Sequence, residues 1–195
     1  MANQNADSLF SLLNSRVEDL EGVAILQSEA GSAESAESIF RACVLLAVSS
    51  LDAFVHEKSV EIYLDRITTS PPALPSIANY LRVSTSDLQS ATAASLIRYK
   101  LSFKTLVSPD KIDEAIEASG SQASTVWKDI GIATGARESR LRNALDLQVD
   151  RRNQIAHEGD WDPVDVALRH ISVSHSQDCR RCIKAVVEGL GTYWS

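Results

Sequence analysis

Apolar side chains recur at three- and four-residue steps along most of the chain, which is the spacing of amphipathic α-helices. The first such series predicts an N-terminal helix and comprises Leu9, Leu12, Leu13, Val17, Leu20 and Val23. After the small-residue break AGSAESAES, a segment from about Glu37 to Arg66 is apolar on nearly every side in its first half. We therefore expect this segment to be the central, most buried helix of a bundle.

Prolines and capping residues divide the middle of the chain. The stretch TTSPPALPS predicts a loop, because proline lacks a backbone donor and disfavours helix for the residue before it. A third helix is expected over Ser84–Phe103, where several N-cap residues precede an apolar run. A short helix is then expected from Ser108, with proline in its first turn, to a stop at Gly120.

The last third of the chain predicts two more long helices. A brief turn around Trp127 and Ile130 is expected before a long helix from near Ala136 to near Gly159. The stretch WDPVDVALRHISVS is expected to be mainly a returning loop. A capping box that opens at Ser174 predicts a last helix ending around Leu190. With no period-2 strand pattern, the predicted fold class is all-α, a helical bundle with a long central helix.

Composition narrows the class of protein. A chain of 195 residues, 44% of them apolar, is expected to form one domain over residues 1–195. The formal net charge of −7 excludes a protein coated in positive potential but leaves room for a local basic site. The longest apolar run, Ala42 to Val48, is short of the roughly 20 residues of a membrane span. With three cysteines and no signal-peptide pattern, we expect a cytoplasmic protein with no membrane partner.

The segment DRRNQIAHEG, residues 150–159, carries the most informative set of polar side chains. Arg152 offers a planar, permanently charged fork of donors that fits phosphate oxygens. His157 can take or give a proton near neutral pH, and Asn153 can orient the phosphate or the imidazole. These groups suit cleavage of a phosphodiester bond, and the chemistry requires no metal.

Helix geometry separates these three residues into two groups. At about 100° per residue, Asn153 and His157 lie about 40° apart, whereas Arg152 lies about 140° from His157. Arg152 instead falls on the apolar stripe of Leu145 and Val149, so we expect it to be partly buried and to need a carboxylate or phosphate partner. Either the helix ends or distorts before His157, or two copies meet across a two-fold axis and build one composite site.

The pattern itself is loose and needs a second signal. An arginine followed by a histidine within a few residues also occurs at Arg169 and His175, in a segment expected to be mostly loop. Requiring asparagine directly after the arginine is more restrictive, although a surface arginine near a capping histidine would look the same.

Two further groups of polar residues are candidates for supporting roles. Ser49, Asp52 and His56 share one side of the central helix, where Asp52 either pairs with Arg152 or orients His157, or else marks a solvated edge. Arg151 is a further supporting candidate. Residues 137–152 of the long helix have a formal charge of +2, and candidate RNA contacts on it are Arg140 and Arg142, unless this is an ordinary ion-paired face.

Metal binding finds little support in the sequence. Cys179 and Cys182 form a CxxC, but there is no second pair for zinc, so helix packing is the simpler interpretation. His56 and Glu57 belong to no His-Glu-x-x-His motif. We expect no metal and no cofactor.

Several segments together resemble one family. RRNQIAHEGDWDP, preceded by a long helix, by SPDKIDEAI and by a Trp-containing turn, resembles the RiboL-PSP-HEPN branch of the HEPN superfamily. LLAVSSLDAFVHEKSVEIYLDRI also looks like the long central helix of that branch, so the resemblance runs from about Phe40 to the C-terminus. The first helix and the segment from Trp161 to Ser174 carry none of it.

The resemblance implies a helical bundle that pairs into a homodimer and acts as a metal-independent endoribonuclease. The active site would lie at the dimer cleft, with Arg152, Asn153 and His157 as its catalytic residues. Relatives often serve as toxins or in phage defence, so an antitoxin or inhibitor protein joins RNA among the expected partners. Two other functions stay open: a catalytically silent dimer that binds RNA, nucleotide or protein, and an oligomerisation module in which Arg152 only forms a core ion pair.

Overall fold

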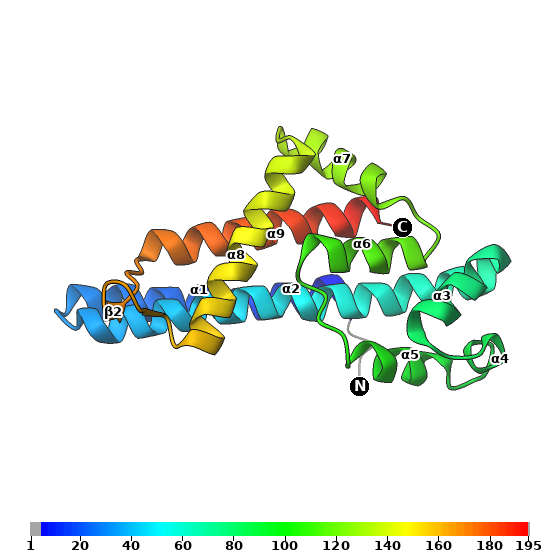
Figure 1. Ribbon diagram of the computed structural model, residues 1–195, viewed down its shortest axis with the longest axis horizontal. Coiled ribbons are helices and arrows are strands. Elements are labelled where there is room, and N and C mark those ends of the chain that lie inside the picture. Colours follow the sequence, from blue (N-terminus) through cyan, green and yellow to red (C-terminus); the bar gives the residue numbers. More distant parts are fainter. Residues whose placement is uncertain (1–4, 195) are drawn as a thin grey trace.

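Three long helices form the body of the molecule. The computed structural model describes residues 5–194, which form nine α-helices, one 3₁₀ turn and a two-stranded hairpin. The helices α1 (Ala6–Glu29), α2 (Ala33–Thr69) and α9 (Val173–Tyr193) run side by side along the long axis, as Figure 1 shows. The predicted all-α class is confirmed.

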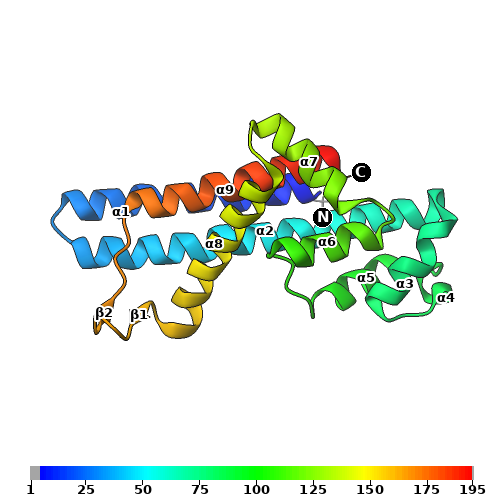
Figure 2. The same cartoon turned by 45° about the horizontal axis from the view of Figure 1, so that its top comes forward.

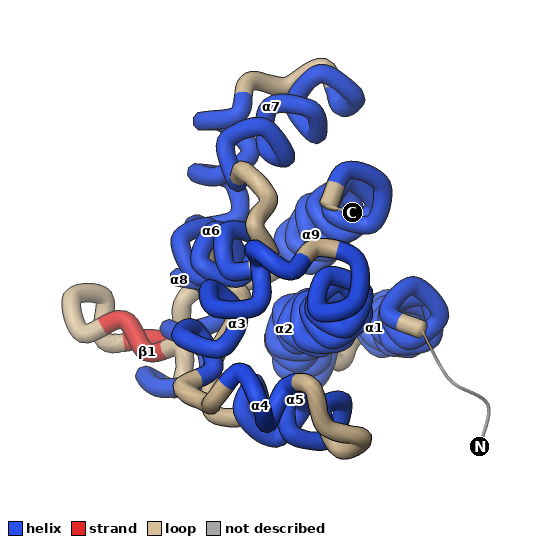
Figure 3. Tube along the Cα trace, turned by 90° about the vertical axis from the view of Figure 1, so that its right-hand side faces the viewer, coloured by secondary structure: helices blue, strands red, loops and turns tan. Residues whose placement is uncertain are grey.

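Helix α2 is the centre of this bundle, as its apolar pattern predicts. It packs against α1, α9, α8 and α5, and in the end-on view of Figure 3 it lies among them. Its buried side chains recur at three- and four-residue steps and include Cys43, Val44, Ala47, Val48, Leu51, Phe54 and Val55. The helix is also long and apolar enough to cross a membrane, although half of its most apolar window is buried and bundle core helices pass the same test. The absence of a membrane partner stays a prediction.

Two buried carboxylates join the long helices to their neighbours. Glu21 of α1 is 3% exposed and accepts hydrogen bonds from Ser176 (2.6 Å) and Arg180 (2.9 Å) of α9. Asp160, which follows α8, is fully buried and accepts from Arg41 of α2 (2.6 Å) and from Arg151 of α8. Buried charges are tolerated when they are paired in this way, and these pairs fix the register between elements distant in sequence.

A second layer crosses the long helices. Helix α8 (Glu138–Glu158) crosses α2 and α9, and α6 (Pro109–Ala118) and α7 (Ala123–Thr134) cover the same side in Figures 1 and 2. The structure confirms the predicted short helix after Ser108 and the long helix ending at Gly159. Gly159 adopts φ 63°, the left-handed conformation that ends helices and that glycine adopts at least cost.

The predicted proline loop is wrong in large part. Residues Pro71–Ala73 form a 3₁₀ turn and Leu74–Leu81 form α3, because prolines in a first turn lack only a donor that would be unpaired there. The predicted helix Ser84–Phe103 is divided into α4 (Thr85–Leu88) and α5 (Ala93–Leu101). Ser90 binds the carbonyl of Asp87 and the amide of Thr92, so its side chain competes with the helix there.

Element ends account for the other differences. Helix α2 begins at Ala33, so only residues 30–32 separate it from α1, and the turn expected around Trp127 is the full helix α7. The expected loop after Gly159 contains a hairpin, β1 (Trp161–Asp162) paired antiparallel with β2 (Ala167–Leu168). Helix α9 is capped by Ser172 with His175, two residues earlier than predicted.

Candidate functional site

Arg152 and Asn153 line a pocket between α8 and the segment that joins α5 to α6. The pocket has a volume of about 470 Å³. The rest of its wall comes from Tyr80, Glu114, Val149 and residues 103–108 together with Lys111. Val149 is buried and Arg152 is half-buried, so the expected position of Arg152 at a helix interface agrees with the structure.

Arg152 has no carboxylate partner among the described residues. Its Nη1 donates to Oδ1 of the adjacent Asn153 at 3.0 Å, and residues 5–194 place no ion pair on it. Its neighbour Arg151 is bound to Asp160 by both terminal nitrogens. A half-buried guanidinium held only by a neutral amide keeps most of its donors available for an anion. The core ion pair that a purely structural Arg152 would require is not formed.

His157 lies one helical turn beyond Asn153 and is exposed. Helix α8 continues without interruption to Glu158, so the helix neither ends nor distorts before His157. The offset of about 140° between Arg152 and His157 within one helix therefore stands. Of the two expected routes to convergence, a break in the helix is not found, and the pairing of two chains stays a prediction.

Asp52 and His56 bind the backbone of the pocket wall and do not bind Arg152. Oδ1 of Asp52 accepts the backbone N–H of Leu106 at 2.6 Å, and Nε2 of His56 lies 3.1 Å from the carbonyl oxygen of Lys104. Nδ1 of His56 is 3.9 Å from Asp52. The proposed pairing of Asp52 with Arg152 is not found, and neither is a fully solvated edge. Both side chains position the segment that carries Lys104.

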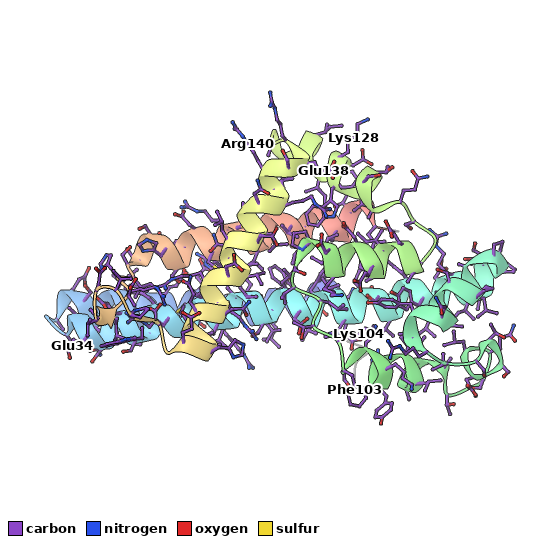
Figure 4. All side chains as sticks on the ribbon, in the orientation of Figure 1. Glu34, Phe103, Lys104, Lys128, Glu138 and Arg140 are labelled. Carbon is purple, nitrogen blue, oxygen red and sulfur yellow. The ribbon has the colours of Figure 1, made fainter. Side chains whose placement is uncertain are left out.

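The other candidates on α8 serve the fold or lie elsewhere. Arg142 donates to Asp113 at 2.6 Å and stacks on the ring of Trp127, so it joins α6, α7 and α8. Hydrogen bonding to Asp113 raises the pKa of Arg142 and keeps it charged. Arg140 is exposed and lies at the far end of α8 from the pocket, about 18 Å along the axis from Arg152 (Figure 4). Arg151 and Arg142 therefore act as anchors, and no contact of Arg140 with the pocket is formed.

The acidic residues of α8 lie away from Arg152. Asp150 is about 200° from Arg152 around the helix. Partial burial, together with the charges of Asp110 and Asp150, raises the pKa of Asp146. Helix α8 therefore has an acidic side and, around Arg152, a side that can accept an anion.

A family model matches residues 11–191, nearly the whole chain, and its description is RiboL-PSP-HEPN. The chain belongs to the RiboL-PSP-HEPN family. The match includes most of α1 and the hairpin segment, which the resemblance in sequence did not reach. HEPN domains are often ribonucleases and are also associated with nucleotide binding, and membership does not choose between the two. No curated protein and no solved structure matches this chain.

The second arginine–histidine pair in this RiboL-PSP-HEPN protein is structural. Arg169 pairs with Glu158 and Asp162, and Nδ1 of His175 accepts the backbone N–H of Ser172 at 3.1 Å. Burial raises the pKa of the Cys179 thiol to about 12, so the thiol is protonated and its helix face is packed. Among residues 5–194, no group of three or more His, Cys, Asp and Glu side chains is placed to hold a metal ion.

Sequence reasoning missed the residues that the pocket draws from the middle of the chain. Lys104 lies 4.1 Å from the ring of Tyr80, and desolvation together with the charges of Arg82 and Lys111 lowers its pKa, against the opposite effect of Glu114. The Tyr80 hydroxyl is buried and has no hydrogen-bond partner among residues 5–194, and burial raises its pKa to about 12. The only available signal was the mixture of Lys, Arg and aromatic residues between residues 80 and 104.

Proposed function

We propose that this protein is a metal-independent endoribonuclease. The RNA 2′-hydroxyl attacks the adjacent phosphorus while the bond from phosphorus to the 5′-oxygen breaks. The products are a 2′,3′-cyclic phosphate and a 5′-hydroxyl. One proton leaves the attacking 2′-oxygen for a base, and one reaches the departing 5′-oxygen from an acid, so the reaction needs no further reactant.

Arg152, Asn153 and His157 divide this chemistry among them. His157, which is exposed, acts as the general base or acid. Arg152 stabilises the charge that develops on the phosphoryl oxygens. Asn153 holds the phosphate or the imidazole with the amide group that already contacts Arg152.

The guanidinium of Arg152 is the observation that carries the proposal. It is half-buried in a pocket wall, lacks a carboxylate among the described residues and belongs to the motif that the family resemblance marks. Removing a charge from water is costly unless an opposite charge joins it, so this position favours a bound phosphate. Arg151 shows the contrast, since Asp160 satisfies it.

The site is composite and is completed by a second copy of the chain. Arg152 and His157 diverge around an uninterrupted helix, so their groups meet most simply across a two-fold axis. The hairpin that follows His157 projects from the body in Figure 2. It exposes several apolar side chains. These are Trp161, Val164, Val166 and Leu168, which are 45–86% exposed. Exposed apolar patches of this kind mark interfaces, and this one adjoins the histidine.

The resemblance to the family also suggests a biological role. A ribonuclease of this family in the cytoplasm would serve as a toxin or phage-defence effector, held inactive by an antitoxin or inhibitor protein. Nucleotide or RNA binding without cleavage is the second candidate, favoured by a pocket volume within the usual range for small ligands.

Cleavage is expected to depend on a single 2′-hydroxyl. Purified protein in EDTA should cut a panel of tRNA and single-stranded RNA, and end-group analysis should find cyclic phosphate. Replacing the nucleotide 5′ to a mapped cut by its 2′-deoxy form removes the nucleophile and should abolish that cut while neighbouring cuts persist. Cleavage that survives at the 2′-deoxy position would exclude the mechanism, and intact RNA bound to the protein would favour the second candidate.

Charging the hairpin tip is expected to separate the protomers. Val164 is 86% exposed, so Val164→Asp should leave the fold intact but place two carboxylates in an apolar interface. Size-exclusion chromatography with light scattering should show a dimer for the wild type and a monomer for the variant, which should also lose cleavage. Val23→Asp, at an exposed position on α1, is the matched control and should stay dimeric. A wild-type monomer with full activity would contradict the composite site.

A further inference from the structure

Three hollows join into one groove that leads to Arg152. The first, of about 990 Å³, lies among α3, α4 and α5 and is lined by Arg82, Tyr99 and Lys100 among others. A smaller hollow shares Arg82 and Lys100 with it. The same small hollow shares Tyr80, Phe103 and Lys104 with the pocket that contains Arg152. We call this continuous surface the α3–α5 groove.

The α3–α5 groove is positively charged, whereas the chain as a whole is negatively charged. Its walls carry five cationic side chains and two carboxylates, in a protein with 19 basic and 26 acidic residues. The cations are Arg82, Lys100, Lys104, Lys111 and Arg152. The carboxylates are already engaged, because Asp87 caps α4 through Ser84 and Glu114 pairs with Lys111. A positively charged strip in an acidic protein concentrates anions at that strip.

Four of the five cations are in no ion pair within residues 5–194, although Asp87 interacts with Lys100 and Glu114 with Lys104 at longer range. No ion pair with another described residue is formed by Arg82, Lys100, Lys104 or Arg152, whereas Arg41, Arg98, Arg142 and Arg151 are all paired. Burial lowers the pKa of Lys104, Glu114 acts in the opposite direction, and the nearby charges of Arg82 and Lys111 lower it further. Cations that repel one another at short range are stabilised by a bound polyanion.

Aromatic rings accompany these charges. Tyr99 and Phe103 are 59% and 72% exposed, and their centroids lie 5.0 Å apart in an edge-to-face arrangement. Figure 4 shows Phe103 at the outer edge of the molecule and Lys104 next to it, on the side nearer α2. Large exposed rings beside lysines form the surface that proteins use to stack unpaired bases.

We propose that the α3–α5 groove binds single-stranded RNA and leads it to Arg152, with a base stacked on Tyr99 or Phe103 and phosphates on Arg82, Lys100 and Lys104. This inference rests on the proposed function and specifies its substrate class. Duplex RNA fits poorly, because its bases are stacked inside the helix and their faces cannot reach the rings. The strand approaches from this side because Asp110, Asp146 and Asp150 make the other side of α8 acidic.

Binding can be measured separately from cleavage. The His157→Ala protein in EDTA is titrated into a fluorescein-labelled, mixed-sequence RNA strand of about 12 nucleotides, and its anisotropy gives Kd. Phe103→Ala in this background should weaken binding about tenfold, the effect of losing one stacked base. Lys100→Ala with Lys104→Ala should weaken it further and reduce the salt slope by about 1.4, or about 0.7 for each charge on a single strand.

Matched controls lie on α7. Ile132→Ala removes a side chain as exposed as Phe103, and Lys128→Ala removes an exposed lysine far from Lys104 in Figure 4. Both should bind RNA like the His157→Ala parent, and thermal melting should show all variants folded. A duplex of the same sequence should bind at least tenfold more weakly than the strand.

Failure of the groove and failure of the proposed reaction are distinguishable. The groove proposal is wrong if the groove variants bind the strand within twofold of the parent. It is also wrong if the duplex binds as tightly as the strand. If the wild type cleaves no RNA while Phe103→Ala still weakens binding, the result supports RNA binding in the groove and contradicts the proposed reaction. The groove variants are also prepared with His157 restored. If the wild type cleaves RNA and these variants cleave it equally well, the result supports the proposed reaction and contradicts RNA binding in the groove.

Discussion

Arg152→Ala and His157→Ala proteins, each nearly inactive alone, are expected to regain RNA cleavage when both chains are expressed together. Loss of either side chain should reduce the rate by a factor of about 10² or more, because electrostatic stabilisation and proton transfer each contribute at that scale. In a mixed dimer, one chain supplies Arg152 and the other supplies His157. Roughly half of randomly paired dimers are mixed, so activity should recover to a substantial fraction of the wild-type rate.

The structure makes this experiment informative, since neither residue supports the fold. His157 is exposed, and Arg152 contacts only Asn153 through a hydrogen bond, so both variants should melt near the wild-type temperature. Differently tagged chains purified in two steps isolate the mixed dimer for kinetics. A dimer of His157→Ala with a doubly substituted Arg152→Ala, His157→Ala chain is the control and should stay inactive. Mixed dimers no more active than this control would show that each chain uses its own arginine and histidine.

The sequence predicted the helices whose signals are local. The apolar spacing of α2 identified the central helix, and Gly159 marked the end of α8 because a left-handed residue there is best served by glycine. The interface position of Arg152 followed from the same periodicity. These features depend on residues within one or two turns of each other, so a single sequence contains them.

Features that depend on distant residues were harder to predict. Arg151 and Arg152 look alike in the sequence, yet one is bound to Asp160 and the other faces a pocket. The partner of Arg151 is the Asp160 carboxylate, which Arg41, more than a hundred residues earlier, also contacts. Asp52 was likewise expected to pair with Arg152 or to orient His157, but its Oδ1 accepts a hydrogen bond from the backbone N–H of Leu106. The α3–α5 groove combines three short helices whose boundaries the proline and serine pattern obscured.

Removing the Asp160 carboxylate is expected to produce the largest loss of stability of any change near the site. Asp160 is fully buried and pairs with Arg41 and Arg151, so Asp160→Ala leaves two largely buried guanidinium groups without their carboxylate. Breaking a buried ion pair from one side costs about 3–5 kcal/mol. For a domain of this size, the melting temperature should fall by roughly 10 °C. Calorimetry or circular dichroism measures this directly.

Two further variants separate charge from backbone effects at this position. Asp160 adopts φ 60°, a left-handed conformation that asparagine tolerates, so Asp160→Asn keeps the backbone while removing the charge. This variant should still show most of the loss of stability expected for Asp160→Ala. Glu158→Ala removes a half-exposed carboxylate paired with Arg169 and should cost within about 1 kcal/mol. Because Arg151 and Asp160 fix the end of α8 that carries His157, cleavage by Asp160→Asn should fall even well below its melting temperature. An Asp160→Asn protein that melts and cleaves like the wild type would show that Arg41 and Arg151 need no common carboxylate to hold α8 in place.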